Sequence, residues 1–306
     1  MAPSATGAYG RPLSLALSLL PDAYRERETI SAPFSRKRER CGGEGLGMRA
    51  HSSAAGKKKN MLSLLSMTSP ETQTPCLIAV IVAGTNEPSN SNTLADAFIE
   101  GMKGVPGIAF EKIRLKELSI DHFTLAHYSD ANAEPDFRRV ETLLKDAQGI
   151  VFASPIWNFS VPAHLKNLID RMGAFALDSA THSQGQLKSK PCALLYTGGA
   201  PMIAWKALMY LTTLHVAEAL KYYDGTIIYR HFEPRCTVGK GVFGLVVDKR
   251  PRTLAALHRA GTSFANTTLY YAQTGSLPFK YKLIHRWFEF LYRVGNRIMY
   301  PISKLQ

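Results

Sequence analysis

Three short segments carry the residue types through which this sequence could bind a ligand. The first, GTNEPSNSNTL over residues 84–94, offers hydroxyls and amides at the start of an expected helix, an arrangement that binds phosphate. The second, PIWNF over 155–159, sets backbone amides beside flat apolar side chains, which suits a heteroaromatic ring. In the third, TGG over 197–199, the glycines let the backbone approach a ligand closely. Each pattern alone is equally typical of turns, caps or core packing, but together they predict a ligand site.

Regular elements must bring these segments together. Runs of apolar and β-branched residues predict strands at residues 77–83, 149–153, 192–196 and 226–230, and an alternating pattern predicts another at 110–115. Apolar residues at helical spacing predict helices at about 93–102, from 135 onward, after 160, from about 201 to 222, and at 251–272, with a long loop over 119–132. Ser160 is predicted to cap the third helix, with Pro162 in its first turn.

The alternation of strands and helices predicts an α/β domain with a doubly wound parallel sheet, because each connection is long enough for a crossover. In such a sheet the loops after strands one, three and four meet at the carboxyl edge, where open α/β sheets bind ligands. The three segments are these loops. The first lacks the GK[ST] ending of a P-loop, which argues against hydrolysis of nucleoside triphosphates.

Residues from about 76 to 272 resemble the NAD(P)H-dependent FMN reductase and quinone/azo reductase group of flavodoxin-like proteins. GTNEPSNSNTL is similar to the phosphate loop of that family, and TGGA to its third flavin loop, which is weakly specific. SPIWNFSVPAHLKNLID is similar to its specific Pro-aromatic-Asn…Pro…Leu-Lys-Asn-x-x-Asp signature. The resemblance covers about two-thirds of the chain and implies a flavodoxin-like five-stranded sheet in the order 2-1-3-4-5.

The resemblance implies a homodimer that holds FMN at the sheet edge, takes hydride from NADPH or NADH, and passes it to a quinone, an azo compound, a free flavin or another acceptor. Because the flavin carries this chemistry, no catalytic side chain is expected. By position, the FMN phosphate is assigned to Thr85, Ser91, Asn92 and Thr93, with Gly84 beside them. The isoalloxazine ring is assigned to Pro155, Ile156, Trp157, Asn158 and Phe159, with Thr197, Gly198 and Gly199 on its other rim.

Two departures from the family pattern affect these expectations. Glu87 stands where relatives often carry a basic residue, which bears on the choice between NADPH and NADH. Ile156 and Phe159 replace the Glu and Gly of the commonest PEYNG form and favour the quinone/azo reductase version. His164, on the helix after the second segment, is expected to be exposed rather than to face the site.

A second class of function stays open, a flavodoxin-like FMN carrier or binding module without nicotinamide turnover. Carrier flavodoxins are usually strongly acidic and carry a T-x-T-G-x-T phosphate loop. This chain of 306 residues has a formal net charge of +13 and a different first loop, which favours the enzyme. After position 75 it still holds 26 Lys or Arg against 18 Asp or Glu, a balance that suits phosphate-bearing cofactors.

Composition also limits the partners. Because no motif that reads DNA or RNA is present, we expect no nucleic acid partner. The four cysteines lack metal-ligand spacing, so we expect no metal and reduced, mostly structural thiols at Cys41, Cys76, Cys192 and Cys236. No apolar run reaches the roughly 18 residues that a membrane-spanning helix needs.

The first 75 residues are expected to be a disordered extension, because they are rich in Ser, Ala, Gly and Arg and lack sustained periodicity. Three interpretations stay open: a signal peptide, a transit peptide, or an upstream extension of the reading frame with Met61 or Met67 as the working start. We favour the third and expect a cytoplasmic protein, with an organelle or a membrane surface as the alternatives. The folded domain is expected at residues 76–275.

Residues 276–306 are expected to form a basic amphipathic helical tail. Lys282, Arg286, Arg293 and Arg297 line one face, and Glu289 is the one acidic residue there. Another face carries an apolar stripe made of Leu283, Trp287, Leu291, Val294 and Ile298. Such a helix can lie on an anionic membrane, or it packs on its own domain or on a dimer partner. We favour the packed alternative at this point.

Overall fold

The computed structural model describes residues 75–128, 133–239, 242–283, 285–287, 290 and 294. The chain divides into two compact units, Met1–Ser66 and Met67–Gln306, and every described residue belongs to the second. The predictions made for residues 1–75 therefore lie outside the described residues, apart from Pro75. The same holds for much of the predicted tail, including five of the residues named for its two faces: Glu289, Leu291, Arg293, Arg297 and Ile298.

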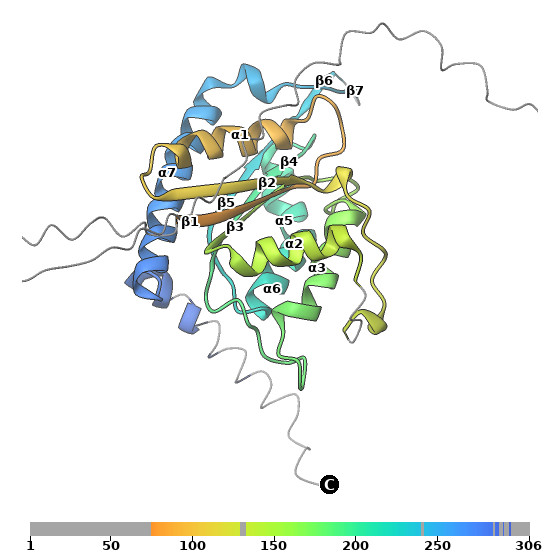
Figure 1. Cartoon of the computed structure of the whole chain (residues 1–306). Coiled ribbons are helices and arrows are strands. Elements are labelled where there is room, and N and C mark those ends of the chain that lie inside the picture. Colours follow the sequence, from red (N-terminus) through yellow and green to blue (C-terminus); the bar gives the residue numbers. More distant parts are fainter. Residues whose placement is uncertain are drawn as a thin grey trace, which may run out of the picture. The chain divides into compact units, whose positions relative to one another are not determined.

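A five-stranded parallel sheet forms the centre of the second unit (Figure 1). Its strand order is β2-β1-β3-β4-β5, as predicted. The order reverses between β1 and β3, so the loops after these strands diverge to opposite sides and leave a crevice at the carboxyl edge. The strands are β1 (Cys76–Val82), β2 (Ile108–Arg114), β3 (Gly149–Pro155), β4 (Pro191–Thr197) and β5 (Thr226–Glu233).

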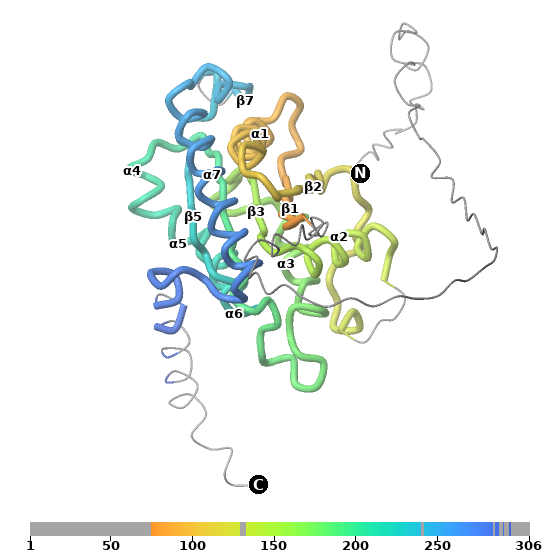
Figure 2. The backbone as a smooth tube through the Cα atoms, turned by 60° about the vertical axis from the view of Figure 1, so that its left-hand side comes forward, coloured from red at the N-terminus to blue at the C-terminus, as the bar shows by residue number. Residues whose placement is uncertain are grey.

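Helices cover both faces of the sheet. On one face α1 (Asn90–Lys103) and α7 (Pro251–Thr274) lie side by side, as Figure 2 shows. Phe98 of α1 meets Phe264 of α7 there, with ring centroids 5.5 Å apart. The other face is covered by α2 (Pro135–Asp146), α3 (Ala163–Ala176) and α6 (Leu214–Tyr222). All residues of β3 and β4 are buried between the two helical layers, which explains their continuous apolar sequences.

A buried ion pair joins α2 to α3. Arg171 of α3 is only 1% exposed, and its guanidinium donates to both carboxylate oxygens of Glu134 at 2.9 and 2.7 Å. It also donates to the carbonyl of Asp121 at 3.0 Å and lies over the Phe137 ring, 4.2 Å from its centroid. The hydrogen bonds from Arg171 hold the pKa of Glu134 down to about 2. The carboxylate is therefore ionised at neutral pH, and the pair fixes α3 beneath the second loop.

Most predicted boundaries differ by a few residues from those observed. β3 and β4 extend beyond their apolar runs because Pro155 still pairs with Thr197. The first helix begins at Asn90 rather than near Thr93, because the Ser89 hydroxyl caps it by accepting the backbone N–H of Asn92 at 3.3 Å. The predicted loop over 119–132 contains a short 3₁₀ turn, η2 (Leu125–Tyr128), and another 3₁₀ turn, η1 (Leu115–Glu117), follows β2.

Two predictions about helices are wrong. Ser160 does not cap α3, because its backbone pairs with that of Trp157, and Pro162 takes the N-cap position before the helix begins at Ala163. The single helix expected up to residue 222 is broken at Thr213, whose hydroxyl donates to the Met209 carbonyl at 3.1 Å. Its first part is α4 (Met202–Ala204), the π-helical turn η3 (Trp205–Met209) and α5 (Tyr210–Thr212).

A short antiparallel hairpin after β5 has no counterpart among the predicted elements. It consists of β6 (Thr237–Gly239) and β7 (Val242–Phe243) and is followed by η4 (Val247–Lys249). Arg250 holds the chain between β5 and β6 by donating to the Glu233 carboxylate and to the carbonyls of Pro234 and Arg235, the last two at 2.6 and 2.8 Å. The hairpin lies beside the start of α1 (Figure 1).

Candidate functional site

A cleft opens at the carboxyl edge of the sheet, beside the switch point between β1 and β3. Four segments line it: the turn from β1 into α1, the end of β3, the end of β4, and the hairpin region. None of the described residues that line it is charged. They are Gly84, Thr85, Asn86, Pro88, Ser89, Asn90, Ser91, Pro155, Ile156, Trp157, Thr197, Gly198, Gly199, Cys236, Phe243 and Gly244.

The first loop, residues 84–91, is a compact turn built on two buried serines. The hydroxyl oxygens of Ser89 and Ser91 lie 3.1 Å apart. A Cβ at Gly84 would lie 2.4 and 2.3 Å from these oxygens, so only glycine fits there. The first backbone N–H groups of α1 have no partner within the helix. With the hydroxyls of this loop they form a neutral donor set suited to a phosphate.

Asn90, the first residue of α1, ties the first loop to the hairpin region. Its side-chain amide donates to the carbonyl of Gly244 at 2.7 Å. Its side-chain oxygen accepts the backbone N–H groups of Val246 and Val247 at 2.9 and 3.1 Å. Three hydrogen bonds from one side chain therefore place Phe243 and Gly244 at the wall of the cleft.

The second loop, residues 155–160, makes a tight two-residue turn. The backbones of Trp157 and Ser160 pair through hydrogen bonds of 2.8 and 3.0 Å. The two residues between them, Asn158 and Phe159, have φ of 48° and 68°, which is the conformation of a type I′ turn. Asparagine tolerates this region, whereas phenylalanine is strained there. Phe159 occupies the position where the commonest family form carries glycine, and the residue is 57% exposed.

The third loop, residues 197–199, rests on an aromatic platform. A Cβ at Gly198 would lie 2.9 Å from the ring of Phe232, and that ring stacks on Trp205 with centroids 4.2 Å apart. The loop is joined to the second by a hydrogen bond from the Ile156 N–H to the Thr197 carbonyl at 2.7 Å. The Gly198 N–H donates to the carbonyl of Glu233 at 3.0 Å, which anchors the loop to the end of β5.

The Glu233 carboxylate, at the end of β5 beside this loop, has two basic partners, His231 and Arg250. Burial raises the pKa of Glu233, but hydrogen bonds from His231 and Arg250 outweigh burial and hold it below its ordinary value. His231 lies 3.0 Å from this carboxylate. Cys236 lines the cleft nearby, and burial raises the pKa of its thiol to about 11. The wall formed by this segment is therefore uncharged toward the cleft at neutral pH.

Nine of the thirteen residues assigned to a cofactor lie together in the cleft. They are Gly84, Thr85, Ser91, Pro155, Ile156, Trp157, Thr197, Gly198 and Gly199. The remaining four do not line it. Asn92 turns toward Asp96 and Lys112, and the Thr93 hydroxyl donates to the carbonyl of Ser89 at 3.0 Å, so both are used by α1 and its surroundings. Asn158 and Phe159 form the tip of the second loop.

Seven lining residues were not among the predicted site residues. Four belong to the first loop: Asn86, Pro88, Ser89 and Asn90. The small and polar residues of this loop predicted a ligand loop, but their sequence does not show which of them face the cleft. The other three come from the hairpin region: Cys236, Phe243 and Gly244. The two strands of the hairpin are three and two residues long, too short for any periodic signal.

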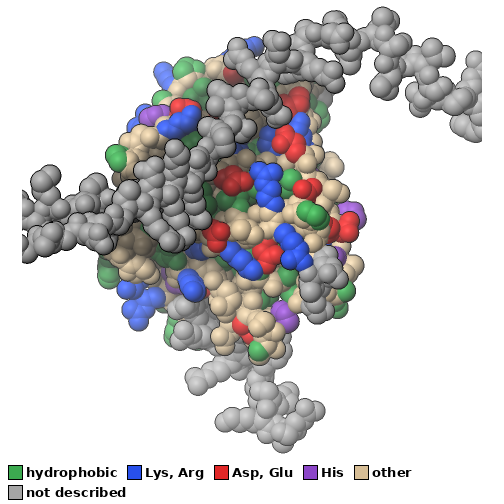
Figure 3. Space-filling model, in the orientation of Figure 1, with side chains coloured by type: hydrophobic (Ala, Val, Ile, Leu, Met, Phe, Trp, Pro, Cys, Tyr) green, Lys and Arg blue, Asp and Glu red, His purple; other side chains and the backbone are tan. Residues whose placement is uncertain are grey.

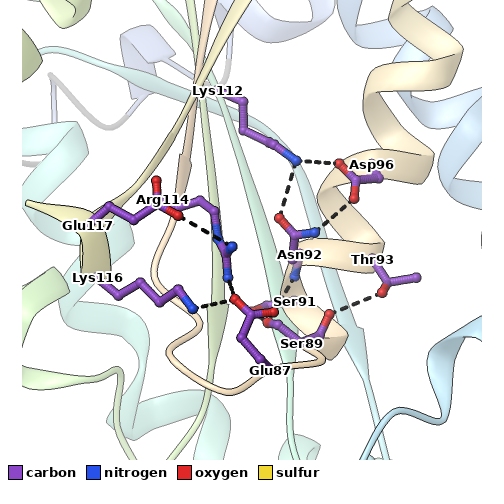
Figure 4. A network of polar contacts seen from close by, with 10 residues as sticks. All are labelled: Glu87, Ser89, Ser91, Asn92, Thr93, Asp96, Lys112, Arg114, Lys116 and Glu117. Carbon is purple, nitrogen blue, oxygen red and sulfur yellow. Dashed lines mark hydrogen bonds and ion pairs between the residues drawn. The ribbon is translucent and has the colours of Figure 1, made fainter. Parts of the chain in front are cut away.

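The charged side chains near the first loop are paired with one another (Figure 4). Glu87 accepts hydrogen bonds from both Arg114 and Lys116, which lower the pKa of its carboxyl, Lys116 the more strongly. Lys112 donates to Asp96 at 2.6 Å. Over the face seen in Figure 3, basic and acidic side chains are likewise interspersed. Lys112, Arg114 and Lys116 therefore each have a carboxylate partner, and Glu87 is the partner of the last two.

His164 is not exposed as predicted. It is half-buried on α3, and its Nε2 lies 2.9 Å from the carbonyl oxygen of Ala83, directly after β1. A carbonyl only accepts hydrogen bonds, so Nε2 carries the proton. Burial lowers the pKa of His164 although the bond to Ala83 opposes that shift. The imidazole supports the first loop from behind instead of facing the cleft.

Residues 76–222 match the family described as NADPH-dependent FMN reductase. This match confirms the resemblance predicted from the three loop sequences. The chain is also 30% identical over 87 residues to an FMN-dependent NADH:quinone oxidoreductase of Desulfotalea psychrophila, covering 26% of this chain and 41% of the relative. It is 33% identical over 97 residues to an NADPH:quinone oxidoreductase of Arabidopsis thaliana, covering 32% and 44%. The matched region therefore spans less than half the length of each curated relative.

Solved structures that match this chain include an azoreductase from Bacillus anthracis. It is 18% identical, with a TM-score of 0.45, and the match covers 62% of this chain and 98% of the azoreductase. A flavone reductase matches at 18% identity with a TM-score of 0.49, covering 66% of each chain.

Proposed function

We propose, from the match of residues 76–222 to the NADPH-dependent FMN reductase family, that this protein is an FMN-dependent NAD(P)H oxidoreductase. It transfers hydride from NADPH or NADH through FMN to an acceptor such as a quinone, an azo compound or a free flavin. The observation that carries the proposal is the convergence of the three loops on one uncharged cleft at the switch point of the sheet.

The two ends of the cleft suit the two ends of FMN. At one end, the serine hydroxyls of the first loop and the start of α1 would hold the phosphate through neutral donors. At the other, Pro155, Ile156 and Trp157 would line one side of the flavin ring, with Thr197, Gly198 and Gly199 on the other rim. Glycine at positions 198 and 199 leaves the backbone there free of side-chain bulk.

The chain contributes binding and orientation rather than acid–base chemistry. When bound, FMN supplies the capacity for hydride and electron transfer. The N–H groups of Ile156, Trp157 and Gly198 already donate to carbonyls of the protein. Stabilisation of negative charge on the reduced ring would therefore fall to another backbone N–H of the third loop, that of Gly199. Cys236 lines the cleft as a neutral thiol, because burial raises its pKa to about 11. The proposal therefore assigns the chemistry to the flavin and no catalytic role to a side chain.

The region next to the second loop supports a homodimer. α4, η3 and α5 present exposed apolar side chains, and the Thr212 hydroxyl donates to the Phe159 carbonyl, which places the exposed Phe159 beside them. Contiguous apolar surface of this kind marks interaction sites. A second copy is the proposed partner, because it would cover this surface at the mouth of the cleft. The exposed residues are Phe159, Met202, Ile203, Leu208 and Leu211.

The dimer is tested by the molar mass of the full chain in sedimentation velocity. We expect a dimer, and we expect the Ile203→Glu and Leu211→Glu variants to dissociate it. A Leu125→Glu variant, which alters an equally exposed leucine on η2, is the matched control and should remain dimeric. A monomeric wild-type protein, or a dimer indifferent to both substitutions in the patch, would refute this part of the proposal.

The enzyme is tested by an absorption spectrum of the purified full chain, with FMN added if none copurifies, followed by anaerobic addition of NADPH and of NADH. We expect flavin bands that bleach with at least one nucleotide and recover when a quinone is added. Bound flavin that neither nucleotide bleaches would favour the alternative, a flavodoxin-like FMN carrier. Failure to take up FMN at all would exclude both functions.

A further inference from the structure

The described helical residues after Leu277 carry an exposed apolar stripe. Within 279–283, 285–287, 290 and 294, the apolar positions are spaced by four, four, three and four residues, which places them on one side of a helix. Their exposed fractions are 79, 60, 58, 56 and 37%, far above those of core residues. We call this set the tail stripe: Phe279, Leu283, Trp287, Phe290 and Val294.

The opposite side of the same helix is fastened to the domain. His285 stands about 160° around the helix from the middle of the tail stripe, by the 3.6-residue period. Its Nδ1 lies 2.9 Å from the Thr226 hydroxyl, and its Nε2 lies 3.0 Å from both the Ser189 hydroxyl and an oxygen of Asp224. These contacts turn the helix so that the tail stripe faces away from the sheet and its helices.

This geometry argues against one of the alternatives that the sequence left open, the packing of the apolar stripe on its own domain. Packing of the helix on its own domain would bury the apolar side, yet the side that meets the domain is the one with His285. The rings of Trp287 and Phe290 lie 6.0 Å apart, and together with Leu283 and Arg286 they line a shallow hollow at the surface. The apolar side is therefore open to an external partner.

The charges beside the tail stripe indicate what that partner is. Lys280 lies at one edge of the stripe, and Lys282 and Arg286 lie at the other, by helical position. Over residues 276–306 the sequence has six Lys or Arg and one acidic residue. Long basic side chains on both edges of an aromatic apolar stripe suit the headgroup region of an anionic bilayer, where the rings enter the interface and the cations stay in water.

We propose that the tail stripe docks this protein on the surface of an anionic membrane. On the membrane the helix would lie in the interface, with the side chains of the tail stripe entering the headgroup region. Among the described residues no helix is long and apolar enough to cross a bilayer. Docking rests on the helix alone and not on the proposed reductase activity. If that activity holds, the tail would bring the enzyme to acceptors dissolved in the lipid.

The proposal is tested by co-sedimentation of the full chain with vesicles of pure phosphatidylcholine and with vesicles containing about 30% phosphatidylserine, at low and at high salt. We expect binding to the anionic vesicles that weakens with salt, and at least tenfold weaker binding to the neutral ones. Replacing Lys282 and Arg286 together by Gln should lower binding to the anionic vesicles roughly tenfold or more.

Trp287→Ser probes the apolar contribution, and Leu125→Ser is the matched control because Leu125 is an exposed leucine on η2, outside the tail. We expect the first variant to lose most vesicle binding and the second to keep it, with unchanged circular dichroism in both. No binding of the wild-type chain to anionic vesicles would overturn the proposal. Equal binding by Trp287→Ser and wild type would overturn it too, as would a dimer that Trp287→Ser dissociates without any vesicle binding.

Discussion

The first and second loops of the cleft are built in opposite ways. The first is held by side chains: two serine hydroxyls, the Asn90 amide, which donates one hydrogen bond and accepts two, and the ion pairs around Glu87. The second is held by its own backbone, with a two-residue turn that forces Phe159 to φ 68° and leaves its ring exposed. The first loop offers fixed donors that suit an anion, whereas the second offers apolar surface that suits the proposed flavin ring and the proposed dimer partner.

This difference also appears behind the loops. The helix after the first loop begins with a capped turn, so its position depends on Ser89. The helix after the second loop begins at a proline with no side-chain cap, and a buried ion pair further along it fixes its place. Substitutions should therefore affect ligand binding at the first loop and stability at the second.

The largest effect is expected from Glu134→Ala. It leaves the Arg171 guanidinium buried without its carboxylate, which should lower the free energy of unfolding by about 3 kcal/mol in urea titrations. Glu111→Ala is the control, because it removes an exposed pair with Arg139 (3.1 Å) and should cost less than about 0.5 kcal/mol. Similar losses in the two variants would mean that the buried pair stabilises the fold no more than the exposed pair does.

The stability lost in Glu134→Ala should depend on pH. The pKa of Glu134 is lowered to about 2 in the folded protein, so its contribution to stability is complete above the ordinary pKa of a glutamate. That contribution should decline as the pH falls through this ordinary value and disappear below about 2. The stability difference between wild type and Glu134→Ala should therefore shrink on acidification, while the difference for Glu111→Ala stays small throughout.

Gly84→Ala should break the first loop. The new Cβ would meet the Ser89 and Ser91 oxygens and displace them, which removes the α1 cap and the hydroxyls offered to the phosphate. We expect the Kd for FMN, measured by flavin fluorescence quenching, to rise roughly tenfold, equivalent to the loss of about one cap. Gly104→Ala, at the other end of α1, adds a Cβ whose nearest neighbour, the Gly101 carbonyl oxygen, lies 3.7 Å away, and this variant should bind FMN as the wild type does.

Phe159→Gly should stabilise the second loop. Glycine adopts positive φ without strain, so we expect a gain of about 1 kcal/mol in the free energy of unfolding. Phe159→Ala is the matched control, because it also removes the exposed ring but keeps the Cβ that causes the strain. The comparison is made at protein concentrations where both variants are monomeric. Equal stabilities for Gly and Ala at this position would show that the turn is not strained.

The fold could be predicted from sequence because its signals are local. β1 is an uninterrupted apolar and β-branched run, and α2 shows a clear apolar face behind Pro135. Such signals specify the kind and order of the elements, and the right-handed crossover rule then restricts the topology. The broken helix before residue 222 escaped prediction because Thr213 favours an alternative hydrogen bond that the apolar pattern does not reveal.

The site could be predicted only where its residues sit in a recognisable loop. The wall formed by Phe243 and Gly244 depends on hydrogen bonds from Asn90, more than 150 positions earlier in the chain. The support of the second loop depends on Arg171 meeting Glu134, 37 positions away. No periodicity encodes such long-range polar contacts. The same limit applies to Glu87, whose sequence position suggested a role in nucleotide choice without revealing its two basic partners.

The smallest expected effect concerns the role of Glu87 in the choice between NADPH and NADH. It tests whether the first loop also contacts the nicotinamide nucleotide. Glu87→Gln removes the carboxylate that balances Arg114 and Lys116 at the edge of the loop. If the donor binds with its adenosine end there, the freed positive charge should favour the 2′-phosphate of NADPH. We expect the ratio of KM for NADPH to KM for NADH to fall roughly threefold, with kcat unchanged.

Glu100→Gln supplies the matched control, because it makes the same charge change at the far end of α1, where Glu100 pairs with Lys103 at 2.6 Å. Assays at low and high salt separate a direct contact with the 2′-phosphate from the effect of the protein's net charge, because salt screens the long-range effect more strongly. Equal shifts in the two variants would assign the effect to net charge. No shift in Glu87→Gln would place the adenosine end elsewhere, and the first loop would then serve the phosphate of FMN alone.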